Sequence, residues 1–196
     1  MPTESWLPRD SCWEATVLSW PQVARRIRVP SGFAFAAVYL WLARPLARSL
    51  MFGAGFVVLG LLIRGLASGH LQKNRELATT GPYAWTRNPL YLGSLIIGVG
   101  FAIAARSLWI AVLLLVMLFA IYLPVIRSEE EFLAAQFPKY ADYAHRVPRF
   151  VPRVRPAAHR DWEFSWGLYW KHREYNATLG AAAIMAALVL KLLRNF

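Results

Sequence analysis

The chain has 196 residues, of which 57% are hydrophobic, and its formal net charge is +11. The apolar residues form long blocks, which excludes an ordinary soluble domain and favours a multi-pass membrane protein. A single cysteine, Cys12, excludes an internal disulfide and a cysteine-based metal cluster. Because the basic residues flank apolar segments, we interpret the positive charge by the positive-inside rule rather than by nucleic-acid binding.

Residues 1–30 hold several tryptophans and the arginines Arg25, Arg26 and Arg28, which predict an interfacial segment lying on the membrane surface. We expect no cleavable signal peptide, because these residues lack a compact apolar core before a small-residue cleavage site. Apolar blocks follow at about residues 32–47, 50–67, 89–105, 108–126 and 177–193. Each is expected to cross about 30 Å of hydrocarbon, although Arg44 and Pro45 interrupt the first. The sequence therefore predicts an all-α, multi-pass membrane bundle of about five transmembrane helices within residues 31–196.

The loop charges predict how this bundle is oriented. The N-terminal segment and the loops at about residues 68–88 and 127–175 hold about three quarters of the lysines and arginines. These parts are therefore expected on the cytoplasmic side, with the C-terminus on the opposite side. Within the second block, Gly53, Gly55 and Gly60 predict close packing against another helix.

The segment from Gly81 to Gly93 places a turn, an arginine and a helix start at a membrane boundary. Asn88 is a favourable helix N-cap, and Pro89 suits the first helical position. Arg87 and the helix N-terminus could together bind an anion. The alternative is a well-formed helix start in which Arg87 only marks the positive side of the membrane.

Three acids, Glu129, Glu130 and Glu131, follow the fourth apolar block directly. A short connection makes the third and fourth spans an antiparallel hairpin, so Arg87 and these acids are expected close together at one membrane face. A carboxylate there could bind a cationic ligand or accept a proton, or it could belong to a solvated charge run. None of the four histidines has metal-ligand spacing, so no metal site is expected.

The loop at residues 127–175 carries apolar and aromatic residues at helical spacing, which predicts an amphipathic helix. They are Phe132, Leu133, Phe137, Tyr140 and Tyr143. Pro148 and Pro152 then predict extended backbone, and the basic stretch at residues 146–160 is expected to contact anionic lipid headgroups. Residues 171–175 are expected to be interfacial anchors that could also close a pocket.

Short motifs recur in order along residues 70–153, and together they resemble the integral-membrane methyltransferases. This group includes the isoprenylcysteine carboxyl methyltransferases and the phospholipid methyltransferases. The motifs are Gly81-Pro82-Tyr83, Arg87-Asn88-Pro89-Leu90-Tyr91-Leu92-Gly93, Glu129-Glu130 with Leu133 and Phe137, and Tyr140, Tyr143 and Arg146-Val147-Pro148.

The resemblance implies S-adenosylmethionine as cofactor, held on the cytoplasmic side, and a lipid-like acceptor that enters from the bilayer. We expect a multi-pass protein of the bacterial inner membrane, with its active site facing the cytoplasm. The chain departs from the pattern at Asn88, where many members carry a titrating histidine. It also departs at Phe137-Pro138, because family members usually carry Phe-Gly there. This chain has one residue fewer before Tyr140 than the usual pattern has before its tyrosine.

We therefore predict methyl transfer from S-adenosylmethionine to a membrane-embedded acceptor, either a carboxylate like that of isoprenylcysteine or an amine like that of a phospholipid. The predicted catalytic residues are Arg87, Glu129 and Glu130. The predicted cofactor-binding residues are Tyr83, Asn88, Pro89, Tyr91, Tyr140, Tyr143, Arg146, Val147 and Pro148. Membrane lipids are expected partners, nucleic acid is not, and the oligomeric state is left open. Two alternatives stay open: a membrane NADPH-dependent reductase of the sterol type, and a non-enzymatic lipid-binding or scaffold protein.

Overall fold

A computed structural model of the chain describes residues 20–72, 76–153 and 164–194. Every regular element within these ranges is helical, which confirms the predicted all-α class. The long helices are α1 (Trp20–Leu42), α2 (Ala47–His70), α3 (Pro89–Ala105) and α8 (Tyr175–Arg194), together with a continuous helix made of α4 (Leu108–Met117), η2 (Leu118–Tyr122) and α5 (Leu123–Gln136). The short elements are η1 (Gly81–Ala84), α6 (Tyr140–Arg146) and α7 (Trp166–Lys171).

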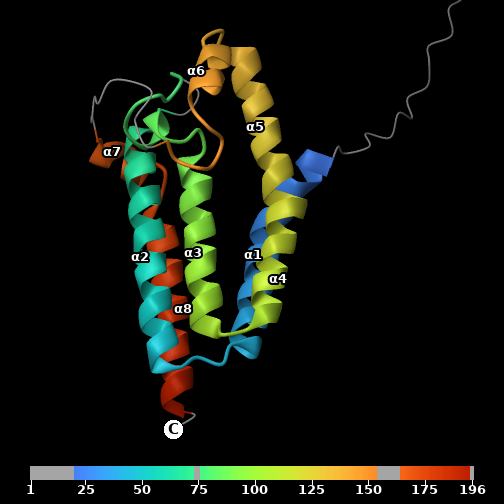
Figure 1. The fold of residues 1–196 in the computed structure, drawn as a ribbon, viewed down its shortest axis with the longest axis vertical. Coiled ribbons are helices and arrows are strands. Elements are labelled where there is room, and N and C mark those ends of the chain that lie inside the picture. Colours follow the sequence, from blue (N-terminus) through green and yellow to red (C-terminus); the bar gives the residue numbers. More distant parts are fainter. Residues whose placement is uncertain (1–19, 73–75, 154–163, 195–196) are drawn as a thin grey trace, which may run out of the picture.

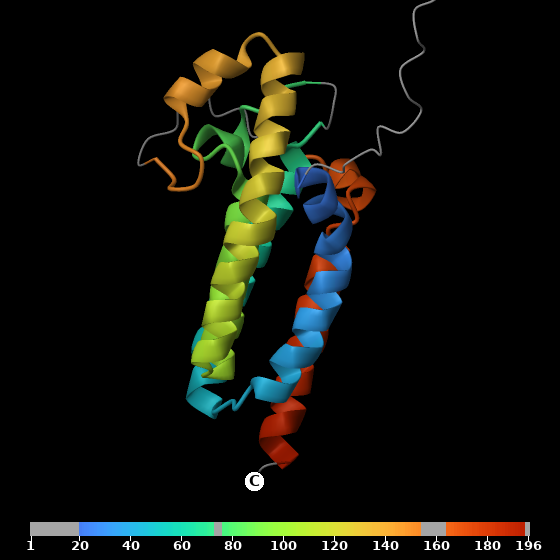
Figure 2. The same ribbon diagram turned by 90° about the vertical axis from the view of Figure 1, so that its right-hand side faces the viewer.

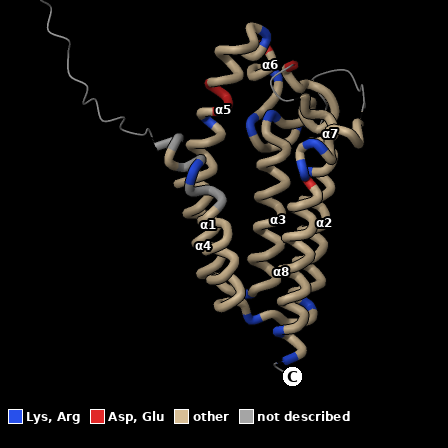
Figure 3. Tube along the Cα trace, turned by 180° about the vertical axis from the view of Figure 1, so that it is seen from behind, with Lys and Arg blue, Asp and Glu red and all other residues tan. Residues whose placement is uncertain are grey.

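The long helices form two layers. One layer holds α2, α3 and the α4–α5 helix, and the other holds α1 and α8 (Figures 1 and 2). The segments η1, α6 and α7 gather at one end of the bundle, which we call the loop end, and the C-terminus lies at the opposite end (Figure 1). Charged residues gather toward these two ends, as Figure 3 shows, which is the distribution expected when an apolar middle faces lipid.

The helix lengths support three membrane spans. Helix α2, the helix Leu108–Gln136 and α8 have 24, 29 and 20 residues and are long and apolar enough to cross a membrane. The apolar part of α1, Pro30–Leu42, and the 17-residue α3 are shorter. Each predicted apolar block contains a helix, the first only as far as Leu42, but the count of five spans is not confirmed.

Two of the predicted boundaries differ from the structure near α1. The first apolar helix ends at Leu42 rather than near residue 47, because the residue before Pro45 is disfavoured in a helix and Arg44 lies in the connection to α2. At its start, α1 begins at Trp20 and runs through Pro30 without a break. The boundary that the sequence suggested at residue 30 thus falls inside a helix, and residues 1–19 lie outside the described ranges.

Glycines set the contact between α2 and α3. A Cβ on Gly53 would lie 2.5 Å from the carbonyl oxygen of Gly100, and one on Gly60 would lie 2.6 Å from that of Gly93. Backbones this close leave no room for a side chain, so the predicted close packing is correct for Gly53 and Gly60. It is wrong for Gly55, where an added Cβ would meet open space.

The predicted amphipathic helix is not a single element. Helix α5 continues the fourth apolar block as far as Gln136, after a π-helical turn in which the Leu123 amide donates to the Leu118 carbonyl. The chain then breaks at Phe137, whose backbone is extended because Pro138 follows it. Tyr140 and Tyr143 therefore lie on the separate helix α6, which folds back over the loop end (Figure 2).

Candidate active site

A buried carboxylate, that of Glu130, is the centre of a polar cluster at the loop end. Only 10% of its side chain is exposed. Arg149 donates to both of its oxygens, with Nε 3.0 Å and Nη2 2.6 Å from Oε2. Asn88 donates from Nδ2 to Oε1 at 3.0 Å, and Arg87 Nη1 lies 3.9 Å from the same oxygen. The structure thus brings Arg87 and Glu130 together as the order of the spans predicted, although their catalytic roles stay predictions.

Two buried polar atoms in this cluster make no well-formed hydrogen bond among the described residues. They are Nε of Arg87 and the hydroxyl of Tyr140. A buried polar group without a partner costs about 1–3 kcal/mol, so such a pair in one small region points to a ligand or water that completes it. Arg87 itself is well fixed, because only 17% of its side chain is exposed and its amide donates to the Pro148 carbonyl at 2.9 Å.

The two tyrosines of α6 have different partners. The Tyr143 hydroxyl donates to the Tyr83 carbonyl oxygen at 2.8 Å, whereas the Tyr140 hydroxyl lies within the cluster. Burial raises the pKa of Tyr140 above its ordinary value of 10.0, and the nearby Glu130 raises it further, while the charge of Arg87 and a side-chain contact with Arg87 lower it. Burial likewise raises the pKa of Tyr143. Both hydroxyls therefore remain protonated donors at neutral pH.

The loop after α6 is held against the turn before α3. The Thr86 hydroxyl donates to the Arg149 carbonyl at 2.9 Å, and the Arg153 amide donates to the Trp85 carbonyl at 3.1 Å. Val147 is buried and lies in extended backbone, as the prolines of this loop predicted. These contacts place Arg149 beside Glu130.

A second acid, Glu129, lies next to the cluster and is joined to α3. The Tyr91 hydroxyl donates to Glu129 Oε1 at 3.0 Å. Tyr83 is buried nearby, and its pKa is raised chiefly by burial and in part by Tyr143, Glu129 and Glu174. Glu131, the third acid of the run, is exposed and stays outside the cluster.

Asn88 occupies the predicted N-cap position of α3 but does not cap it. Pro89 is the first helical residue, as expected, and it is buried. The Asn88 side chain makes no capping hydrogen bond and instead donates to Glu130. An amide donor serves this role because it needs no titration to hold the carboxylate.

The structure places in the cluster an arginine that the motifs did not include, Arg149, while a cofactor-binding role of Arg146 stays a prediction. Arg146 is exposed, and its Nε donates to the carbonyl of Asp142, at 3.2 Å, rather than to the cluster. Arg149 is the one that pairs with Glu130, and this contact raises the pKa of its guanidinium. In the sequence, Arg149 is one of several arginines in the basic stretch at residues 146–160, and no spacing rule predicts which of them pairs with Glu130.

A large apolar cavity of about 870 Å³ lies between the two layers, below this cluster. Two helices, α3 and the α4–α5 helix, run from the Glu130 cluster to the cavity. On the α4–α5 helix, Leu114, Leu118, Tyr122 and Ile126 line the cavity at intervals of four residues, and Glu130 is next in the series. On α3, the lining residues Tyr91, Leu95, Gly98 and Ala102 follow Arg87 and Asn88 at intervals of three or four residues.

Helices α1 and α8 form the opposite wall of the cavity. Gly32 on α1 and Gly180 on α8 line it, and a Cβ at either position would meet nothing within 4 Å. A packed core adjoins the cavity at Phe101, and in it the Tyr39 hydroxyl donates to the Phe101 carbonyl at 2.9 Å.

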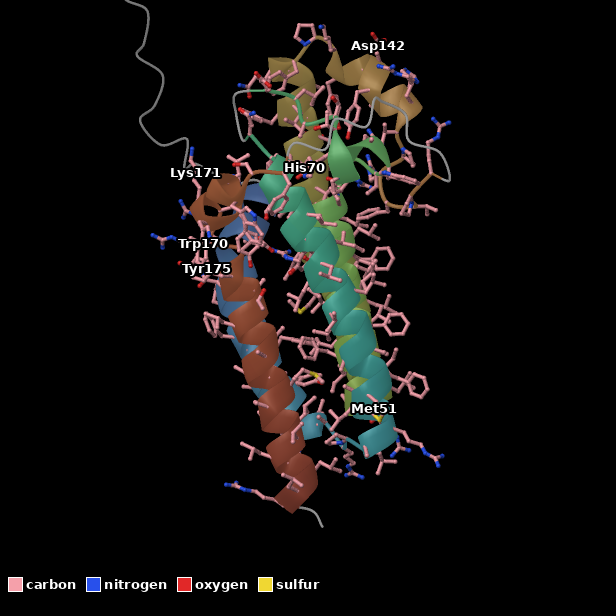
Figure 4. The ribbon with its side chains drawn as sticks, turned by 90° about the vertical axis from the view of Figure 1, so that its left-hand side faces the viewer. Met51, His70, Asp142, Trp170, Lys171 and Tyr175 are labelled. Atoms are coloured by element: carbon pink, nitrogen blue, oxygen red, sulfur yellow. The ribbon has the colours of Figure 1, made fainter. Side chains whose placement is uncertain are left out.

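A partly buried ion pair at the cavity wall was not predicted from the sequence. Arg64 of α2 lines the cavity, and its Nε donates to Glu174 at the turn into α8. Its Nη1 donates to Ser94 and to the Leu90 carbonyl, the latter at 3.3 Å. Trp170, Lys171 and Tyr175 project near the start of α8 (Figure 4), and Glu174 directly precedes Tyr175 in the chain. The 171–175 segment thus meets the cavity wall through the pairing of Glu174 with Arg64, and the residues of α8 that line the cavity begin at Asn176.

The charges of the cluster do not cancel. Glu130 faces the two cations Arg87 and Arg149, while Glu129 is held apart by Tyr91. The region around Nε of Arg87 and the Tyr140 hydroxyl thus has a surplus of positive charge and two donors, which suits a carboxylate or another anionic group. Among the described residues, no group of three histidines, cysteines or acids is arranged to hold a metal ion.

Comparison with known proteins finds similarity over part of the chain. A nickel-cobalt-cadmium resistance protein of Alcaligenes xylosoxydans xylosoxydans is 37% identical over 115 residues, which cover 58% of this chain and 53% of the relative. A cobalt-zinc-cadmium resistance protein of Cupriavidus metallidurans is also 37% identical over 115 residues, with 58% and 52% covered. The chain therefore spans about half the length of these curated relatives. No solved structure matches it. The model of the phospholipid methyltransferase family matches residues 51–140, so the resemblance to membrane methyltransferases that the motifs predicted is confirmed over this segment.

Proposed function

We propose that the protein transfers a methyl group from S-adenosylmethionine to an acceptor held in the membrane. One observation carries this proposal: a polar cluster with two unpaired buried donors lies directly above a large apolar cavity, and α3 and the α4–α5 helix line both. A charged, water-soluble cofactor and an apolar acceptor need compartments of these two kinds side by side. The family match over residues 51–140 supports the same reaction class.

The residues of the cluster fit the charged end of S-adenosylmethionine. Nε of Arg87 and the Tyr140 hydroxyl are unpaired donors that would meet its carboxylate. Glu129 and the face of Tyr91 would attract its cationic groups, because carboxylates and aromatic faces both stabilise positive charge. When bound, S-adenosylmethionine supplies a methyl group from a positively charged sulfonium.

The chain's own residues would align the reaction rather than drive it. Glu130 fixes Arg87 and Arg149, and Asn88 fixes Glu130, so the cluster is held in place before any ligand binds. Such alignment and exclusion of water are what a methyl displacement needs most. Glu129 lies at the border with the cavity through Tyr91, where it could accept a proton from an amine acceptor. An ionised carboxylate acceptor would need no such base.

Calorimetry on the purified full chain tests the proposal. The wild-type protein should bind S-adenosylmethionine and S-adenosylhomocysteine, and Arg87→Ala should weaken both by about 10- to 100-fold, the equivalent of one charged hydrogen bond. Arg127→Ala is the matched control, because Arg127 is an exposed arginine of the same end that makes none of the contacts of the cluster. Absence of binding of both compounds to the wild-type protein would refute the proposal. A parallel titration with NADPH tests the reductase alternative.

A further inference from the structure

The ion pair of Arg64 and Glu174 lies where the cavity wall is otherwise mostly apolar. Arg64 is the residue that α2 contributes to this wall, and 23% of its side chain and 10% of that of Glu174 are exposed. A buried ion pair adds little net stability, since the cost of removing both charges from water offsets their attraction. Stability alone therefore does not explain why a guanidinium lies at this position.

The hydrogen bonds of Arg64 leave one edge of the guanidinium unused. Nε is occupied by Glu174, and Nη1 by Ser94 and the Leu90 carbonyl. Nη2 has no partner among the described residues, although Arg64 lines the cavity. Ser94 is also fixed, since its hydroxyl donates to the Leu90 carbonyl at 2.9 Å. The guanidinium is thus held on two sides while its third side remains available.

The position of this edge relates it to the cluster described above. Ser94 is one helical turn along α3 from Tyr91, and Tyr91 both lines the cavity and donates to Glu129. A head group bound at Arg64 would therefore lie beside the residues that border the proposed reacting centre. Its hydrocarbon part would occupy the apolar remainder of the cavity.

We propose that Arg64 binds an anionic oxygen, of a carboxylate or a phosphate, on the amphiphilic molecule that occupies the cavity. Glu174 and Ser94 are positioning residues that hold the guanidinium with Nη2 free. The inference rests on the proposed function for the identity of this molecule as the methyl acceptor. Binding of the molecule itself requires neither the cofactor nor turnover.

Binding of three amphiphiles with the same dodecyl chain tests the proposal. Dodecanoate, dodecyl phosphate and dodecanol are titrated into the full chain in a neutral maltoside detergent, without S-adenosylmethionine, and bound ligand is measured by native mass spectrometry. At least one of the two anionic compounds should bind about tenfold tighter than dodecanol, because a charge-assisted hydrogen bond outweighs a neutral one. Preference for the carboxylate or for the phosphate identifies the kind of head group.

Two variants separate binding from folding. The double variant Arg64→Met, Glu174→Gln removes both charges together, so no buried charge is left unpaired, and it should bind all three compounds equally. Glu174→Gln alone keeps an acceptor for Nε but removes the neutralising charge, so it should strengthen the preference for anions. Arg106→Met, at the opposite end of the bundle, is the control and should behave as wild type.

The proposal is overturned if the wild-type protein binds the anionic compounds no tighter than dodecanol, or if the double variant keeps the preference. A lower preference in Glu174→Gln would also overturn it. Failure of the calorimetric test with S-adenosylmethionine would refute the methyltransferase proposal while leaving these results unchanged, so the two proposals fail independently.

Discussion

Two tyrosines on the same short helix should respond in opposite ways when their hydroxyl groups are removed. Tyr140→Phe deletes a buried hydroxyl that has no partner among the described residues, whereas Tyr143→Phe deletes one that donates to the Tyr83 carbonyl at 2.8 Å. An unpaired buried polar group costs about 1–3 kcal/mol, so Tyr140→Phe should leave stability unchanged or raise it by about 1 kcal/mol. Tyr143→Phe should lower stability by about 1 kcal/mol.

For the affinity for S-adenosylmethionine, Tyr140→Phe should have the large effect and Tyr143→Phe the small one. If the Tyr140 hydroxyl completes the binding of an anionic group, its loss removes a hydrogen bond to a charged partner, worth about 1.5–3 kcal/mol, and the Kd should rise by about 10- to 100-fold. The Kd of Tyr143→Phe should change by less than about threefold, because its hydroxyl is already used by the backbone.

Thermal unfolding in detergent and calorimetry with S-adenosylmethionine measure both effects on the same preparations. The reasoning is refuted if Tyr140→Phe loses as much stability as Tyr143→Phe, since the Tyr140 hydroxyl would then have a structural partner. It is equally refuted if Tyr140→Phe binds S-adenosylmethionine as tightly as the wild-type protein does.

Three further predictions concern the scaffold. Gly60→Ala should destabilise the protein by more than about 2 kcal/mol, because the added Cβ would lie 2.6 Å from the Gly93 carbonyl oxygen. Gly55→Ala should be neutral or stabilising, because its Cβ would meet open space. Thermal unfolding of the two variants compares these effects directly. Arg106→Gly should raise stability by up to about 1 kcal/mol in the same assay, because Arg106 ends α3 at a φ of 54°, which glycine adopts without strain. Burial raises the pKa of Tyr143 above 10.0, so the unfolded chain loses this proton first, and stability should fall as pH rises above about 10. Tyr143→Phe should make that fall less steep in a pH series, with the remainder due to Tyr83 and Tyr140, whose pKa values burial also raises. An equally steep fall in this variant would exclude Tyr143 as a source.

Much of the site could be predicted because it depends on the order of the helices. The end of one helix and the start of its antiparallel neighbour must lie at the same end of a bundle, and this brings Arg87 to Glu130 at 3.9 Å. The helices themselves follow from long apolar blocks, which have few alternatives in a membrane. The helix boundaries were predicted less well than the helices, because Pro45 and Pro138 end helices that the apolar pattern alone would continue.

The parts that could not be predicted depend on irregular backbone or on distant pairs. Arg149 reaches Glu130 because the loop around it is held by backbone contacts to residues 85–87, and such contacts leave no periodic pattern in the sequence. Arg64 and Glu174 lie 110 positions apart, and neither belongs to a motif that would single it out. The side chain of Asn88 was expected to cap a helix, but the stronger partner nearby was a carboxylate.

The loop contacts around Arg149 also limit what a comparison of relatives can show. The family match ends at residue 140, whereas the cation that pairs with Glu130 stands at position 149 and the carbonyl that receives the Arg87 amide at position 148. An alignment that stops at residue 140 would therefore contain Glu130 without Arg149, and Arg87 without the Pro148 carbonyl that accepts a hydrogen bond from its amide. Relatives should be compared through residue 153, where the Arg153 amide makes the last of these contacts, before conservation at the site is judged.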